Sequence, residues 1–355
     1  MEHTLRIRAA RSPGEVRVAV TQDGGLVDYA IWRPGTPDGV GDLHRGRIAA
    51  RVSAMAGAFV ALAGGEGFLP DSEGGADTSE GQILGVRVTR AAQGGKGPRL
   101  TARLADNEAA LAGDGPVRLI RRGPDPIEEL AARYSGAEVL RCDGIAGFDA
   151  ELEEQIAALA SPEVALPGGG RMHIQPTPAL VAIDIDAGSS TAERREKSSS
   201  QQALNRGALP ELARQIRLRN LSGAILVDFA GLSARRRAGL EPELRRALAS
   251  DPLRPRLLGF TQLGLAEIVR PRVHPPLHEV LAGPLAAGLA ALRQVEQELA
   301  VTPARRAVLT AAPAIVTALQ TDTVALPELA HRIPHPLVLR SDPALSGCRL
   351  EFRDG

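Results

Sequence analysis

The sequence contains little cysteine, lysine or aromatic residue. Its two cysteines, Cys142 and Cys348, lie far apart and outside any CxxC spacing, which argues against a disulfide framework and against a cysteine-based zinc site. Only Lys96 and Lys197 are lysines, so 40 of the 42 basic residues are arginines. Arginine suits phosphate recognition because its guanidinium is a planar fork. Aromatic residues make up 3% of the chain, so any that falls on an exposed strand is informative.

The chain also lacks a net charge, a long apolar run and a signal-peptide pattern. It has 42 acidic and 42 basic residues, so the overall charge gives no indication of nucleic-acid binding. Because no apolar run reaches about 18 residues and no leader pattern is present, we expect a cytoplasmic protein without a membrane partner. The length of 355 residues allows two or three domains.

Two short apolar runs that end on carboxylates are the most informative feature. Residues 179–186 read Ala-Leu-Val-Ala-Ile-Asp-Ile-Asp, and residues 224–229 read Ala-Ile-Leu-Val-Asp-Phe. Such runs are typical of buried strands. The basic segment 212–223 between them predicts a helix, with Pro210 in its first turn.

A strand-helix-strand unit sets its two strands side by side, which would bring Asp184 or Asp186 close to Asp228. Acidic groups at the ends of buried strands are costly unless something pairs with them. Mg²⁺ held by one or two carboxylates and a substrate phosphate is one such partner, and the flanking arginines make a phosphodiester its natural substrate. Aspartate at a strand end is also a common turn or cap residue, and spacing alone leaves that alternative open.

The remaining segments predict further domains. Residues 4–32 alternate like an antiparallel meander, with a hairpin turn at Asp23-Gly24-Gly25. Residues 36–105 hold about five short strands with glycine-rich turns, which suggests a small barrel such as an OB-fold. A helix is expected from Pro126 with Asp125 as its N-cap, and residues 284–340 predict a small terminal α+β unit.

Read together, these blocks resemble the catalytic region of the bacterial ribonuclease E/G family. The similarity is strongest at 179–186, 205–223, 225–229 and 259–272, where residues 214–219 read Arg-Gln-Ile-Arg-Leu-Arg. The segments 56–70 and 94–101 resemble the family's inserted RNA-binding OB-fold. Ordered agreement over nearly the whole chain is more specific than any single block.

The resemblance implies an α+β fold with four parts. These are an RNase H-like domain (1–35 and 106–178), an inserted OB-fold β-barrel that binds RNA (36–105), a DNase I-like catalytic α/β unit (179–280) and a small C-terminal α+β domain (281–355).

The resemblance also implies the function. The family cleaves single-stranded RNA endonucleolytically with Mg²⁺ held by two aspartates, which by position would be Asp184 and Asp228. The metal, with Mn²⁺ as an alternative, would activate phosphodiester hydrolysis. Asp186 is a third candidate metal ligand. The candidate RNA-binding residues are Phe59, Phe68, Lys96, Asn205, Arg214, Arg217 and Arg219.

Several departures from the family pattern qualify this expectation. The family usually has Asn where this chain has Asp186, and Gln262 replaces a residue that is often basic. Residues 105–117 are too short for the family's 5′-end sensor, so we expect little preference for 5′-monophosphorylated RNA. The CPxC motif of the zinc link is missing, so we expect no zinc link and leave open a homodimer without zinc bridging.

Two alternatives remain beside the nuclease. The first is a catalytically inactive RNA-binding relative of the same family. The second is an RNA-binding regulator that uses the barrel alone. For Phe59 and Phe68, the alternative to RNA stacking is the barrel core.

Overall fold

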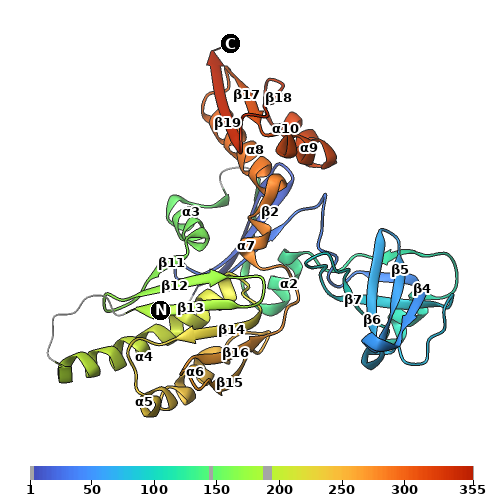
Figure 1. Ribbon diagram of the computed structural model, residues 1–355. Coiled ribbons are helices and arrows are strands. Elements are labelled where there is room, and N and C mark those ends of the chain that lie inside the picture. Colours follow the sequence, from blue (N-terminus) through green and yellow to red (C-terminus); the bar gives the residue numbers. More distant parts are fainter. Residues whose placement is uncertain (1–3, 144–146, 187–193, 355) are drawn as a thin grey trace. The chain divides into compact units, whose positions relative to one another are not determined.

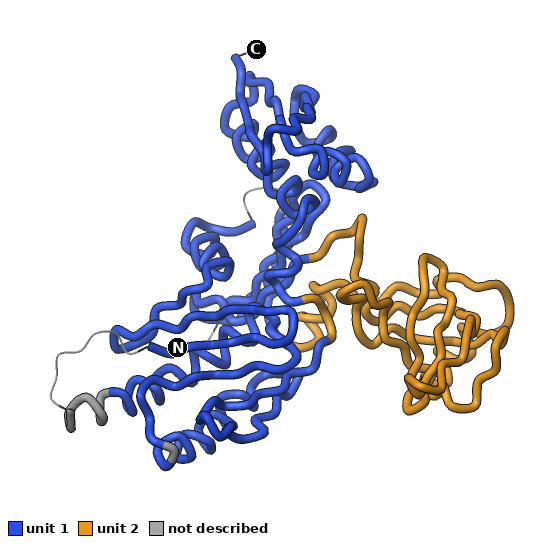
Figure 2. The backbone as a smooth tube through the Cα atoms, viewed as in Figure 1, with its two compact units in different colours: residues 1–31, 137–272, 276–355 blue, residues 32–136, 273–275 orange. Residues whose placement is uncertain are grey.

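The computed structural model describes residues 4–143, 147–186 and 194–354. Strands and helices fall into two compact units, residues 1–31, 137–272 and 276–355 in the first and residues 32–136 and 273–275 in the second (Figure 2). Mixed sheets with segregated helices make an α+β fold, as expected. No helix in the described ranges is long and apolar enough to cross a membrane.

The first sheet of unit 1 is the predicted meander with a later strand added. Its order is β10-β1-β2-β3, in which β1 pairs antiparallel with β2 and parallel with β10. Asp23 and Gly24 both have positive φ, as a tight hairpin turn requires. Helix α3 packs on this sheet through Leu152 and is capped by Asp149, whose carboxylate accepts from the Leu152 amide. The elements are β1 (Leu5–Ser12), β2 (Glu15–Gln22), β3 (Gly25–Trp32), β10 (Glu138–Asp143), α3 (Ala150–Ala157) and the 3₁₀ turn η4 (Ala158–Ala160).

The second sheet of unit 1 has the order β11-β12-β13-β14-β16-β15 (Figure 1). Helices α4 and α6 bury one face of it, where Leu212 and Leu244 join Ile183 and Ile225 in one apolar cluster. The elements are β11 (Glu163–Ala165), β12 (Arg171–Pro176), β13 (Val181–Asp186), α4 (Arg194–Leu218), β14 (Gly223–Asp228), α5 (Ala234–Ala238), α6 (Glu241–Leu248), β15 (Arg256–Phe260) and β16 (Ala266–Arg270).

The prediction that Pro210 lies in the first turn of the helix is wrong. Helix α4 begins at Arg194, so Pro210 lies in its interior. Proline there leaves the carbonyl four residues earlier without its helical donor. Arg206 and Pro210 are both exposed, so water can satisfy that carbonyl and the helix continues.

A three-stranded sheet, β18-β17-β19, and helices α7 to α10 form the end of unit 1. Ala307 and Leu309 of β17 pack with Leu289 and Leu292 of α8. The elements are α7 (Leu277–Val280), α8 (Gly283–Val301), β17 (Arg305–Ala311), α9 (Pro313–Thr321), α10 (Ala325–Arg332), β18 (Val338–Ser341) and β19 (Cys348–Asp354).

Unit 2 is built on a closed barrel of five strands. Strand β4 pairs with β5 and β7, and β8 pairs with β6 and β7, so the pairing with β5–β6 closes the ring. Strand β9 adds to β4, which makes this unit longer than the barrel segment 36–105 expected from the sequence. The elements are β4 (Leu43–Val52), η1 (Ser53–Met55), β5 (Gly57–Leu62), β6 (Gly65–Pro70), η2 (Asp71–Glu73), β7 (Ile83–Arg90), β8 (Arg99–Thr101), α1 (Asp106–Ala112), β9 (Arg118–Arg121) and α2 (Pro126–Arg133).

Unit 2 also contains a histidine held between two carboxylates. His274 Nδ1 lies 2.6 Å from Asp38 Oδ2, and its Nε2 lies 3.1 Å from Glu129 Oε2. Burial alone lowers the pKa of His274, but the hydrogen bonds to Asp38 and Glu129 outweigh burial and raise it to about 9. The resulting imidazolium joins residues 273–275 to two earlier segments of the same unit. Asp125 is the N-cap of α2, as predicted, and it also forms a capping box with Glu128.

Candidate functional site

Asp184 and Asp228 lie directly opposite each other on neighbouring strands. Strands β13 and β14 are parallel and paired in register, with Asp184 opposite Asp228. Alternation buries Ile183, Ile185 and Val227 under the helices and leaves both aspartates on the other, exposed face. Within the described residues, no hydrogen bond or ion pair joins either carboxylate to a protein group. The predicted strand-helix-strand geometry is therefore present, with two unpaired acids side by side.

The arrangement fits a divalent ion that needs few protein ligands. The described residues contain no group of three or more His, Cys, Asp or Glu side chains that could hold a metal. Asp186 faces the same side as Asp184 but lies one pleat repeat further on, opposite Arg171 of β12. A repeat of two residues is about 7 Å, so the backbone of Asp186 lies further from Asp228 than that of Asp184. Mg²⁺ is commonly held by one or two carboxylates and several waters, which matches the pair but does not support the predicted third ligand.

His173 is a neighbour of the pair that the sequence reading missed. It lies opposite Asp184 on the antiparallel strand β12, and Glu163 of β11 lies opposite His173. All four side chains of this row are exposed on one face. The alternation of β12, with Met172 and Ile174 buried, would have placed His173 on that face had the strand been assigned.

Asn205 fixes the segment that follows Asp228. Its side chain is fully buried, its Nδ2 donates to the carbonyls of Gln201 and Ala230, and its Oδ1 accepts from the Ala230 amide. These bonds tie α4 to the residue two positions after Asp228. Asn205 was predicted to bind RNA, but its side chain has no exposed surface and its bonds hold the segment that follows Asp228.

The three predicted phosphate-binding arginines of α4 bond to other parts of the protein. Arg214 and Arg217 donate to the carbonyls of Leu26 and Val27 on β3. Arg219 is 6% exposed and donates to Gln215 and to the carbonyl of Ser161. Arg219 is therefore a structural residue, because reaching phosphate would leave buried acceptors unpaired. Arg214 and Arg217 are partly exposed, but their Nε groups serve the edge of the first sheet.

The barrel carries its two predicted aromatic residues on the outside. Phe59 and Phe68 are cross-strand partners on β5 and β6, with ring centroids 5.7 Å apart in an edge-to-face pair. Both are partly exposed, whereas their neighbours Val60 and Leu69 are fully buried. The barrel-core alternative is thus wrong for both rings.

Basic residues lie beside these rings. Arg99 of β8 is opposite Phe68, a position that sequence reasoning missed although buried Leu100 predicts the outward direction of Arg99. Lys96 is exposed in the turn just before β8, where it bridges with Gln93. Two aromatic faces next to cations can hold unpaired bases and a phosphate backbone.

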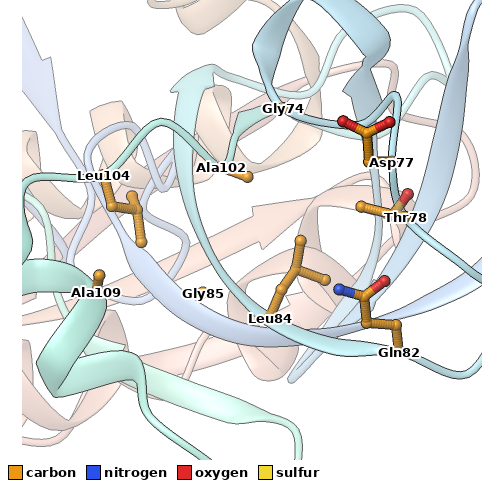
Figure 3. Close-up of a pocket in the computed structure, with 9 residues that line it drawn as sticks. All are labelled: Gly74, Asp77, Thr78, Gln82, Leu84, Gly85, Ala102, Leu104 and Ala109. Atoms are coloured by element: carbon orange, nitrogen blue, oxygen red, sulfur yellow. The ribbon is translucent and has the colours of Figure 1, made fainter.

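The barrel unit also contains a cavity of about 340 Å³ beside α1 (Figure 3). Leu84, Leu104 and Ala109 form its apolar side, and Asp77, Thr78 and Gln82 supply its polar groups. None of the site residues predicted from the sequence lines it, so it takes no part in the argument for the aspartate pair.

Comparison with known proteins gives a consistent result for the second sheet. The Ribonuclease E/G family matches residues 145–273. This segment contains both aspartates, Asn205 and the three α4 arginines, and leaves out the barrel.

Three curated relatives illustrate the match. Ribonuclease E of Nostoc sp. (strain PCC 7120 / SAG 25.82 / UTEX 2576) is 39% identical over 122 residues, which are 34% of this chain and 17% of that protein. Ribonuclease E of Escherichia coli (strain K12) is 37% identical over 132 residues, 36% of this chain and 12% of that protein. Ribonuclease G of Salmonella typhimurium (strain SL1344) is 31% identical over 149 residues, 41% of this chain and 30% of that protein. The matched segment thus spans less than a third of each relative.

Proposed function

We propose that the chain is a member of the ribonuclease E/G family, to which residues 145–273 are similar, and that it is a Mg²⁺-dependent endoribonuclease that cleaves single-stranded RNA. The observation that carries the proposal is the register pair Asp184–Asp228, exposed on one sheet face and without a bonding partner among the residues that the structure describes. Such a pair is unfavourable by itself because like charges directly opposite repel. A divalent cation bound with a phosphodiester removes that cost.

Each residue near the pair has a role that follows from its contacts. Asp184 and Asp228 would hold the metal, which when bound polarises the scissile phosphate and activates water. Asn205 keeps the segment after Asp228 in place through its bonds to Ala230. His173, exposed next to Asp184, is placed to donate a hydrogen bond to a phosphate oxygen of the bound strand.

The barrel would supply most of the grip on single-stranded RNA. The exposed sides of Phe59 and Phe68 offer stacking surfaces for bases, while Arg99 and Lys96 would contact phosphates. Stacking tolerates any base, so we expect weak sequence preference from this surface. We assign the barrel as an OB-fold, the first sheet as part of an RNase H-like domain and the second sheet as a DNase I-like catalytic unit, with the domain limits given from the sequence.

Family features that this chain lacks lead to further expectations. Without the 5′-sensor segment, RNA with a 5′-monophosphate or a 5′-hydroxyl should be cut at similar rates. Without the CPxC motif, any homodimer should form without zinc. A cytoplasmic location stays a prediction.

One experiment separates the nuclease from the inactive RNA-binding relative. Cleavage of a labelled, unstructured RNA is measured with and without Mg²⁺ for the wild type and for Asp228→Asn. We expect metal-dependent cutting that the variant loses while it still binds RNA. Glu163→Gln is the matched control, because Glu163 lies on the same face two strands away from Asp184 and its loss should leave cutting intact. Binding without cutting by the wild type would favour the inactive relative.

A further inference from the structure

One face of the terminal sheet is covered by arginines. Register places Arg306 of β17 opposite Arg353 of β19, and Thr310 of β17 between Arg340 of β18 and Arg349 of β19. All four arginines are exposed. Alternation puts them on the side away from the helices, because Ala307, Leu309 and Ala311 fill the core with α8 and α9. We call this surface the arginine face; its members are Arg306, Val308, Thr310, Val338, Arg340, Arg349, Glu351 and Arg353.

The arginine face is positively charged although the domain that carries it is nearly neutral. Residues 276–355 contain seven arginines and eight carboxylates. The arginine face nevertheless carries four arginines and one carboxylate, Glu351, among eight positions. Four of the eight acids lie on helices, where Glu296 and Glu298 pair with Arg332 and Arg305. The domain therefore separates its charges and leaves a positive sheet surface.

The arginine face has few internal partners. Arg353 pairs with Glu351 at 3.0 Å, and Arg349 lies 3.9 Å from Asp342. Arg306 and Arg340 make no ion pair with any residue that the structure describes. Like charges directly opposite on a sheet are destabilising, so the pair Arg306–Arg353 costs stability when the protein is alone. An external polyanion would remove that cost.

We propose that the arginine face binds the phosphate backbone of single-stranded RNA, a proposal that rests on the proposed function for its choice of polyanion. The face carries no aromatic residue, so it contacts phosphates without stacking bases and without reading sequence. A second copy of the chain is a poorer occupant, because a two-fold contact through this face would set arginines against arginines. The surface thus holds a substrate strand by charge, separately from the aspartate pair and the barrel.

The test measures RNA affinity against salt concentration on the full chain, without Mg²⁺, by fluorescence anisotropy. Each phosphate contact on a single strand contributes about 0.7 to the slope of log Kd against log salt. Replacing Arg306 and Arg340 by Gln should therefore lower the slope by about 1.4 and weaken binding several-fold at moderate salt. Arg305→Gln is the matched control: it is the neighbour in sequence but lies on the opposite face, paired with Glu298 and Asp354, and its slope should equal that of the wild type.

Three outcomes would overturn the proposal. The first is a salt slope that is unchanged in the double variant, and the second is a slope that falls equally in the Arg305→Gln control. The third is a wild-type oligomer, seen in sedimentation, that dissociates in the double variant while the salt slope of RNA binding is unchanged. A different result would contradict the nuclease assignment. A chain that binds with the expected slopes but cuts no RNA loses only that assignment, and one that cuts RNA with an unchanged slope loses only the arginine face.

Discussion

Replacing Asp228 by Asn should make the metal-free protein more stable and the Mg²⁺-bound protein less stable than the wild type. Neighbouring strands lie about 4.8 Å apart, and Asp184 and Asp228 are directly opposite. Two charges at about 5 Å in a water-like medium repel by about 0.8 kcal/mol, which Asp228→Asn would relieve.

Mg²⁺ should reverse this order. With about 10 mM Mg²⁺ and a Kd of about 1 mM, binding stabilises the wild type by about 1.4 kcal/mol. The variant loses most of that gain because one of its two ligands is neutral. The net result is a wild type about 0.5 kcal/mol more stable than the variant in Mg²⁺ and about 0.8 kcal/mol less stable in EDTA.

Calorimetric melting in EDTA and in Mg²⁺ checks this reversal. A change of 1 kcal/mol shifts the melting temperature by roughly 2–4 °C in a domain of this size. Asp186→Asn serves as the control, since Asp186 lies one pleat repeat away opposite Arg171 and its loss should keep the Mg²⁺ shift. Equal Mg²⁺ shifts in the wild type and in Asp228→Asn would refute the metal site.

Three further predictions concern other residues. The pKa of His274 is raised from 6.5 to about 9, so its pairing with Asp38 and Glu129 stabilises unit 2 fully below pH 6.5 and is lost as the pH rises towards 9. The shift corresponds to up to about 3 kcal/mol, which screening of a side chain 31% exposed reduces to about 1–2 kcal/mol. The free energy of unfolding, measured with urea, should therefore fall between pH 6.5 and pH 9 in the wild type and should not change with pH in this way in His274→Ala. Asn205→Ala should lower the free energy of unfolding by about 1–3 kcal/mol. It should also lower kcat more than it raises KM, because it disturbs the catalytic segment but no RNA contact. A raised KM with unchanged kcat in steady-state kinetics would contradict this prediction. Phe68→Ala should weaken RNA binding by about 1–3 kcal/mol in anisotropy titrations with kcat unchanged, and full affinity in this variant would remove the barrel from the RNA path.

The carboxylate pair could be predicted from the sequence because its determinants are local. Apolar runs that end on Asp184 and Asp228, separated by a helix, lead to adjacent parallel strands through the general rule for such units. The barrel was predicted for a similar reason, since Phe59 and Phe68 lie in short strands between glycine turns. What these patterns leave open is which face a side chain takes when neighbouring strands are still unassigned, as for His173.

The roles of the arginines depended on contacts between distant segments. Arg219 donates to Ser161 across 58 residues, and no spacing in the sequence points to that carbonyl. Arg306 and Arg353 meet only because β17 and β19 pair in one register. The start of α4 was misjudged because Pro210 favours a helix start locally, while packing of the longer helix on the sheet outweighs one lost hydrogen bond.

The most direct test of the account is cleavage of a short, unstructured, AU-rich RNA by the wild type and by Asp184→Asn, each with and without Mg²⁺. The account predicts that the wild type cuts the RNA only with Mg²⁺ and that the variant, folded and still able to bind the RNA, does not cut. Cutting by Asp184→Asn at the wild-type rate would contradict the assignment of the paired aspartates as the catalytic site.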